Sequence, residues 1–222
     1  RLGEKAVVRV TSAVAKALGL PKSRVFSSST GVIGEPLPYD RITTRVHDLA
    51  ANLDPGGIEK AARAIMTTDT FPKGAAAEIA GEGGPIRIAG IAKGSGMIAP
   101  DMATMLGYVF TDAAVAPAFL QELLSAANRR SFSCITVDSD TSTSDTVLAF
   151  ATGQAGNTAL TGWDSAGADA FAAALQDVCL QLAHLVVRDG EGAQKFIAVN
   201  VTGAVSDDSA RRVGLAVANS PL

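Results

Sequence analysis

The sequence predicts a layered α/β domain, in which helices cover the faces of β-sheets. Predicted strands come in clusters and predicted helices come in pairs between them, so the strict alternation of a parallel doubly wound sheet is absent. Hydrophobic residues make up 47% of the 222 residues and charged residues 18%. This is the composition of a globular protein with enough apolar material for a core.

Six segments carry the apolar spacing or the boundary signals of helices. The first ends at the stop signals Gly19 and Pro21. In the clearest one, apolar residues from Phe171 to Leu185 recur at intervals of three and four, and Gly190 ends the helix. The predicted helices are 3–20, 39–53, 57–66, 117–128, 171–185 and 207–218.

Shorter apolar runs rich in β-branched and aromatic residues predict strands. Segments 76–80 and 86–92 are joined by the glycine-rich turn 81–84. Segments 132–137 and 146–151 flank a polar loop, which is typical of a hairpin connection. The predicted strands are 24–28, 76–80, 86–92, 104–110, 132–137, 146–151 and 196–201.

Charge and composition exclude several classes of protein. A net charge of −3 without a cluster of Lys and Arg gives no reason to expect nucleic-acid binding. No apolar run has the length of a membrane span, and no signal segment opens the chain. The two cysteines fit a reducing compartment, so we expect a cytoplasmic protein. The sequence starts at Arg1 rather than at a methionine, and it ends at Leu222 just after an apolar segment. We therefore expect a piece of a longer protein.

Metal and nucleotide sites have weak support. The polar loop 138–145 concentrates oxygen ligands, but Thr143 and Ala149 occupy the positions where an EF-hand requires glycine and glutamate. Local hydrogen bonds between side chains and backbone explain such a loop better. No Walker A sequence or G-x-G-x-x-G occurs. His47 and His184 lie far apart in predicted helices, so a Ser-His-Asp triad requires the fold to bring distant segments together.

Three polar segments stand where a ligand has access. Thr30-Gly31 follows a predicted strand; its backbone donors are able to form an oxyanion hole, although residues alone favour an ordinary loop. Segment 67–73 ends a helix with four successive hydrogen-bonding side chains, as a simple capping sequence also does. Segment 188–195 places Glu191 between glycines after the long helix, where it is exposed for ligand binding.

Thr104 stands where a constrained turn becomes a buried strand. The glycine-rich segment Lys93-Gly-Ser-Gly96 and then Pro100-Asp101 precede it, and 104–110 is apolar. A structural threonine could occupy such a position, but a threonine nucleophile needs one, because a rigid strand holds its hydroxyl in place.

Taken together, these segments resemble the glutamate N-acetyltransferase family, also called ornithine acetyltransferase, of arginine biosynthesis. The stretches that carry the resemblance occur in the family's order over nearly all of the chain, and the stretch around Thr104 is the most specific. They are 28–34, 67–70, 93–106, 138–146 and 188–193. The resemblance implies a layered α/β/β/α-type sandwich, related to a self-processing aminopeptidase, of which this chain is a fragment.

The resemblance also implies that the precursor cuts itself between Ala103 and Thr104. Residues 1–103 of this partial domain then belong to an α chain and residues 104–222 to a β chain, and two α and two β chains form a heterotetramer. Thr104 would be the nucleophile. An uncut threonine lacks a free amine, whereas after cleavage its α-amino group, with a pKa of about 7.7–8.0 when unperturbed, suits a general base.

The implied reaction moves an acetyl group from N-acetylornithine to glutamate through an acetyl ester on Thr104, and some members also accept acetyl-CoA. No cofactor or metal is implied. The resemblance assigns the oxyanion hole to Thr30 and Gly31 and substrate contacts to Thr70, Lys93, Thr104 and Glu191. The family completes its site with an asparagine and a threonine or serine near its C-terminus, beyond any matching stretch here. Whether this piece alone is active is therefore open.

Two other functions remain open from the sequence. A self-processing amidohydrolase or aminopeptidase of the N-terminal-nucleophile type requires the same chemistry at Thr104, but water takes the acyl group. A non-catalytic binding domain that kept the fold would have an uncut chain.

Overall fold

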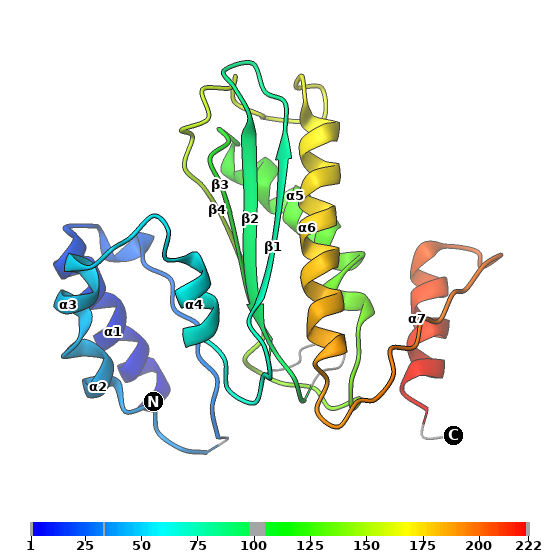
Figure 1. Ribbon diagram of the computed structural model, residues 1–222, viewed down its shortest axis with the longest axis horizontal. Helices are drawn as coiled ribbons and strands as arrows, with labels where there is room; N and C mark the ends of the chain where they lie inside the picture. Colours follow the sequence, from blue (N-terminus) through cyan, green and yellow to red (C-terminus); the bar gives the residue numbers. More distant parts are fainter. Residues whose placement is uncertain (1, 33, 98–104, 221–222) are drawn as a thin grey trace. The chain divides into compact units, whose positions relative to one another are not determined.

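The computed structural model describes residues 2–32, 34–97 and 105–220 (Figure 1). The chain forms two compact units, Arg1–Ile58 and Glu59–Leu222. Each unit has its own set of packed elements, so each is described by itself.

The first unit is helical. Helix α1 (Leu2–Leu18) packs against α2 (Tyr39–Thr43) and α3 (Val46–Ala51), and a 3₁₀ turn, η1 (Lys22–Arg24), follows α1. The predicted helix 39–53 is thus two short helices. The hydroxyl of Thr44, at the break, donates to the carbonyl of Asp40 at 2.9 Å. Helix α4 (Ile58–Ala64) crosses the boundary between the units.

A four-stranded sheet forms the centre of the second unit, in the order β1-β2-β3-β4. Strands β1 (Lys73–Ile79), β2 (Ile86–Lys93) and β3 (Leu106–Thr111) are successively antiparallel. Strand β4 (Thr146–Ala151) runs parallel to β3. In this register β1, β3 and β4 begin, and β2 ends, at the same end of the sheet.

Helix α6 (Ala168–Arg188) covers one face of the sheet (Figure 1). It contacts β1 and β2, and α5 (Pro117–Arg129) packs beside it. The contact is close because β2 carries Gly90 there: a Cβ at Gly90 would lie 2.8 Å from Leu182 Cδ1 and 3.3 Å from Val178 Cγ1. By length and composition alone α6 could cross a membrane, but its apolar stripe is buried against the sheet.

The opposite face of the sheet is also apolar. Phe110 of β3 stacks on Phe150 of β4 with ring centroids 5.5 Å apart, and Phe110 is 39% exposed. The predicted α/β class is confirmed: in the described part of the second unit, one sheet is covered on one face by a layer of helices. In the predicted sandwich, a second sheet would cover the face that carries Phe110.

Three predicted strands are wrong. Segments 24–28 and 196–201 form no strand, and their apolar side chains are largely exposed; Phe26 is 62% and Ile197 77% exposed. Segment 132–137 starts with a 3₁₀ turn, η2 (Phe132–Cys134), whose Phe132 is buried against the core. A strand requires a neighbour for its backbone groups, and local composition cannot show whether one is present.

The helix predictions agree better with the structure. Those for α1, α4, α5 and α6 are confirmed to within a few residues, and that for α7 (Asp207–Ala218) matches at both ends. At the start of α7 the hydroxyl of Ser206 accepts a hydrogen bond from Ser209 N–H at 3.1 Å, which is a normal N-cap.

Truncating Leu182 to alanine should destabilise the protein by about 2–5 kcal/mol, because this buried side chain fills the space between α6 and Gly90. The neighbouring substitution Gln181→Ala, on the exposed side of α6, should change the free energy of unfolding by less than about 0.5 kcal/mol. Urea unfolding of both variants measures the difference. Equal stability of the two would contradict the described packing of α6.

Candidate functional site

A buried lysine joins two buried aspartates at the end of the sheet where β1 begins. Lys73 Nζ lies 2.7 Å from Asp69 Oδ1 and 2.5 Å from Asp189 Oδ2, and the Lys73 side chain is fully buried. The lysine also lies over the ring of Phe71, 4.8 Å from its centroid. Removing these charges from water is costly, so the cluster is stable only while its members remain paired.

Hydrogen bonds keep both carboxylates ionised. Burial disfavours the charged form of Asp69, but hydrogen bonds from Lys73, from Gly94 N–H at 2.7 Å and from Thr67 N–H at 3.1 Å outweigh it and lower its pKa. Burial likewise opposes ionisation of Asp189. Its pKa is lowered by hydrogen bonds from Lys73 and from the hydroxyl and N–H of Thr70. The cluster therefore fixes segment 67–73 against the end of β2 and the end of α6.

Lys93 is a second buried lysine in the same cluster. It ends β2, is 2% exposed, and its Nζ lies 4.0 Å from Asp69 Oδ2. Burial lowers the pKa of Lys93. The negative charges of Asp69 and Asp145 oppose this decrease, and the positive charge of Lys73 adds to it. Because Asp69 already binds Lys73 closely, Lys93 is less closely paired than Lys73 and is suited to bind an anionic group of a ligand.

Glu191 lies against the turn that follows Lys93. Its N–H donates to Ser95 O at 2.6 Å, and the Ser95 hydroxyl donates to Asp189 O at 2.7 Å. A Cβ at Gly96 would lie 2.8 Å from Glu191 Oε2, so glycine at this position makes room for the carboxylate. Glu191 is exposed, and its carboxylate lies beside Gly96, three residues after Lys93, where it is open to solvent.

Asp145 occupies the start of the two parallel strands. Its Oδ1 accepts a hydrogen bond from Met105 N–H at 2.7 Å, and Met105 O accepts one from Thr146 N–H at 3.0 Å. Burial raises the pKa of Asp145 to about 6, although the bond from Met105 and the charge of Lys93 oppose the rise. A buried carboxyl group with a raised pKa thus contacts the backbone of Met105, which is the residue after Thr104 in the sequence.

A profile of the ArgJ family matches residues 1–222. The chain belongs to the ArgJ family. It is 58% identical over 220 residues to the arginine biosynthesis bifunctional protein ArgJ of Ruegeria pomeroyi, and 56% identical over 220 residues to that of Zymomonas mobilis. These matches cover 99% of this chain but 52% and 54% of the relatives, so the chain spans about half the length of the curated relatives.

Two solved structures match part of the chain. A crystal structure of ArgJ from Bacillus halodurans has 43% sequence identity and a TM-score of 0.49, over 51% of this chain and 53% of that one. An L-aminopeptidase D-Ala-esterase/amidase from Ochrobactrum anthropi, described as a variant of the Ntn hydrolase fold, has 13% identity and a TM-score of 0.35. It covers 57% of this chain and 43% of its own.

In this ArgJ-family chain the predicted substrate-binding residues Thr70, Lys93 and Glu191 lie around one cluster. The predicted cleavage site, Ala103 and Thr104, lies outside the described residues. Thr30 and Gly31 belong to the first unit, so the predicted oxyanion hole remains a prediction.

The residues that hold the cluster together were missed from the sequence. They are Asp69, Lys73, Asp145 and Asp189. A usable signal was present, because Lys73 and Lys93 stand at the ends of two adjacent apolar strands, where buried cations need carboxylate partners. The sequence does not indicate which aspartates reach them.

Loop 138–145 forms local hydrogen bonds, as predicted, but it is not a hairpin connection, because segment 132–137 before it forms no strand. Asp138 accepts hydrogen bonds from Met97 N–H at 2.5 Å and Asp140 N–H at 3.2 Å. Within the described ranges, no group of three or more His, Cys, Asp or Glu has an arrangement able to hold a metal ion.

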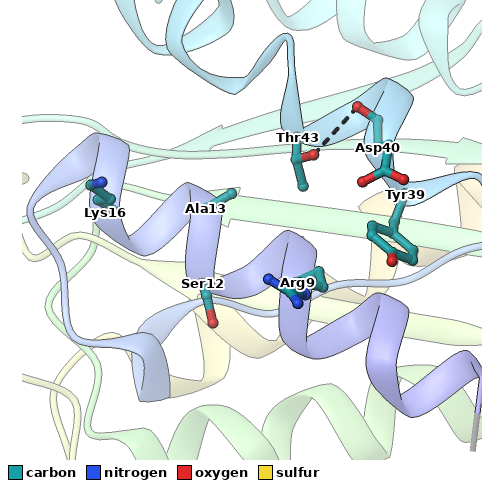
Figure 2. A pocket seen from close by; sticks show the side chains of 7 residues that line it. All are labelled: Arg9, Ser12, Ala13, Lys16, Tyr39, Asp40 and Thr43. Carbon is teal, nitrogen blue, oxygen red and sulfur yellow. Dashed lines mark hydrogen bonds between the residues drawn. The ribbon is translucent and has the colours of Figure 1, made fainter.

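Figure 2 shows a separate hollow in the first unit, between α1 and α2. Its sides mix the cations Arg9 and Lys16 with the anion Asp40, and these three residues are exposed. The Thr43 hydroxyl donates to Asp40 O at 3.3 Å within α2. The hollow has no buried polar group directed into it and is not a candidate for the site.

Replacing Lys73 by methionine should destabilise the protein by about 3–5 kcal/mol at pH 7, since two buried carboxylates lose their partner. The matched control Lys22→Met, at an exposed position, should have little effect. Denaturant unfolding of both variants measures the change, and a neutral Lys73→Met would show that the ion pairs contribute no net stability.

The cost of Lys73→Met should shrink in acid. The folded pKa values of Asp69 and Asp189 are lowered, so the stability that they contribute is present above their unfolded values near pH 4 and is lost as the pH falls through the folded values. Unfolding curves between pH 2 and pH 7 should therefore converge for wild type and variant at the acid end. A constant difference across this range would contradict the electrostatic origin.

Proposed function

We propose that the whole protein transfers an acetyl group from N-acetylornithine to glutamate in arginine biosynthesis. The observation that carries this proposal is that three segments far apart in the sequence place Thr70, Lys93 and Glu191 around one buried cluster. This cluster lies at the end of the sheet where the strand after Thr104 begins. The name of the relatives, arginine biosynthesis bifunctional protein, supports the same function.

In this proposal the chain is cut between Ala103 and Thr104, giving residues 1–103 and 104–222. The pairing of β2 with β3 explains how the two chains would stay together. Six residue pairs, from Ile88–Thr111 to Lys93–Leu106, join strands on opposite sides of the cut. Helix α6, on the 104–222 side, also packs on β1 and β2 of the 1–103 side.

The reaction proceeds by two acyl transfers. The hydroxyl oxygen of Thr104 attacks the acetyl carbonyl of N-acetylornithine, and its proton passes to the freed α-amine of Thr104. Ornithine leaves as an amine after receiving that proton, and an acetyl ester remains on Thr104. The amine of glutamate then attacks the ester, giving N-acetylglutamate and restoring the hydroxyl. Thr30 and Gly31 stabilise the oxyanion in each step.

The charges of the cluster match an amino-acid substrate. Lys93 binds the substrate carboxylate, and Glu191 binds the cationic amino group. The Thr70 hydroxyl donates its hydrogen to Asp189, so toward a substrate it acts as an acceptor. This separation of positive and negative groups favours a zwitterionic amino acid over a simple amide.

We also propose acetyl-CoA as a second acetyl donor, since the relatives are called bifunctional. The assembly is proposed to be a heterotetramer of two α and two β chains in the cytoplasm. The unpaired Cys134 and Cys179 are compatible with a reducing compartment. Residues of the full-length protein beyond this chain complete the site.

Intact mass spectrometry of the full-length protein should give two masses that correspond to a cut before Thr104. Thr104→Ala should give one uncut chain without transfer activity, because it lacks the hydroxyl for both reactions. Thr104→Ser keeps a hydroxyl and should remain cut and partly active. An active, uncut wild type would contradict the proposal.

Incubation with N-acetylornithine and glutamate separates transfer from hydrolysis. We expect N-acetylglutamate and ornithine in equal amounts. Free acetate without N-acetylglutamate would identify an amidohydrolase instead, and no turnover of an uncut chain would identify a binding domain.

Glu191→Gln should lower kcat/KM for N-acetylornithine by about ten- to hundredfold, since a neutral amide binds the cationic amino group more weakly. The change should leave the cut intact, because it is nearly isosteric. The control Glu59→Gln lies on exposed α4 and should behave as wild type. Unchanged kinetics in Glu191→Gln would remove this residue from the substrate site.

A further inference from the structure

Asp189 holds both hydrogen-bond donors of Thr70. Its Oδ1 accepts the hydrogen of the Thr70 hydroxyl, and its Oδ2 accepts the Thr70 N–H at 2.9 Å. Oδ2 also lies 2.5 Å from Lys73 Nζ. The Asp189 side chain is 3% exposed, whereas Thr70 is an exposed residue. A buried carboxylate therefore fixes the hydrogen of an exposed hydroxyl.

The direction of the hydroxyl bond follows from the charge of Asp189. Burial opposes the ionisation of Asp189, but the hydrogen bonds from Lys73 and Thr70 outweigh it and lower its pKa. An ionised carboxylate only accepts hydrogen bonds, so the Thr70 hydroxyl has to donate to it. Because a hydroxyl has a single hydrogen, Thr70 then offers only its oxygen lone pairs to a ligand. The group of a ligand that binds Thr70 must therefore be a donor.

The acetamide of N-acetylornithine supplies such a donor. In the proposed function the substrate carboxylate binds Lys93, and the terminal ammonium binds Glu191. The amide N–H is the donor that remains, and it belongs to the nitrogen that leaves in the reaction. An ester has an acceptor oxygen in place of this N–H, and that oxygen would face the lone pairs of Thr70. A site that binds a particular N–H in this way rejects an analogue that lacks it.

We propose that Asp189 is a positioning residue that turns the Thr70 hydroxyl so that its oxygen accepts the amide N–H of N-acetylornithine. This contact selects the N-acetyl amino acid over the corresponding ester. The inference rests on the proposed function. Asp189 touches no substrate atom and transfers no proton, because it acts through Thr70. Lys73 and the Thr70 N–H both bind Oδ2, so they fix the rotation of the carboxylate that directs Oδ1 at the hydroxyl.

Asp189→Asn should reverse the polarity of Thr70. Lys73 and the Thr70 N–H donate to the same oxygen, so the amide carbonyl should take the place of Oδ2 and the NH₂ group the place of Oδ1. The NH₂ group then donates to the Thr70 oxygen, and the hydroxyl hydrogen is released toward the ligand. Lys73 keeps Asp69 as a partner at 2.7 Å. In this variant the amide N–H meets a second donor, whereas an ester oxygen meets a matching one.

The experiment measures kcat/KM of the full-length protein for two acetyl donors, with glutamate as the acceptor. The donors are N-acetylornithine and the acetate ester of the α-hydroxy analogue of ornithine. The ratio of the amide value to the ester value isolates the contact at the amide nitrogen. Asp189→Asn should lower this ratio by about tenfold or more, since the amide loses its acceptor. The control Asp177→Asn, on the exposed side of α6, should keep the wild-type ratio.

Variants of Thr70 test whether Asp189 acts through this hydroxyl. Thr70→Val removes the hydroxyl and should also lower the ratio about tenfold, whereas Thr70→Ser keeps it and should retain the wild-type ratio. In the Thr70→Val background, adding Asp189→Asn should change the ratio no further. If Asp189→Asn does not fold, the two single variants of Thr70 decide: an unchanged ratio in Thr70→Val overturns the inference.

The outcomes separate this inference from the proposed function. A folded Asp189→Asn variant in which both values fall together, at a constant ratio, would show a purely structural role and overturn the inference while leaving the proposed function intact. Wild-type protein that forms no N-acetylglutamate from N-acetylornithine and glutamate would instead overturn the proposed function.

Discussion

The ammonium of Lys73 between Asp69 and Asp189 is the constraint on which the site depends. A lysine without solvent exposure is tolerated only if its charge is matched, and here two carboxylates from distant segments match it. Each carboxylate in turn accepts backbone N–H groups: Asp69 from Thr67 and Gly94, and Asp189 from Thr70. The ion cluster therefore positions three loops that no sheet or helix holds by itself.

The pairing of Lys73 also governs Lys93. Both lysines lie near Asp69, but its Oδ1 is 2.7 Å from Lys73 Nζ, whereas its Oδ2 is 4.0 Å from Lys93 Nζ. Lys93 thus keeps a buried, weakly compensated charge at the end of β2. Glu191 has a solvent-exposed negative charge beside Gly96, three residues after Lys93. The charges are thus separated: the positive charge of Lys93 is buried, and the negative charge of Glu191 is exposed.

Sheet topology adds the third part of the site. Because β4 runs parallel to β3, both strands begin at the same end, and Asp145 reaches the N–H of Met105. The hairpin that was predicted for loop 138–145 would have paired β4 with segment 132–137, whereas β4 pairs with β3 instead. The parallel arrangement thus places a carboxyl group at the start of β3, and burial raises the pKa of this group to about 6.

The sequence by itself determined the α/β class, most of the helices, strands β1 to β4 and the family, because periodicity, turn residues and family motifs are local. Segments 24–28, 132–137 and 196–201 have strand-like composition but no strand, since pairing depends on a neighbour elsewhere in the chain. Only the tertiary structure decided the partners of Lys73 and the contact of Asp145 with Met105. Asp189 follows Lys73 by more than one hundred residues, and a buried charge is matched through space rather than along the sequence.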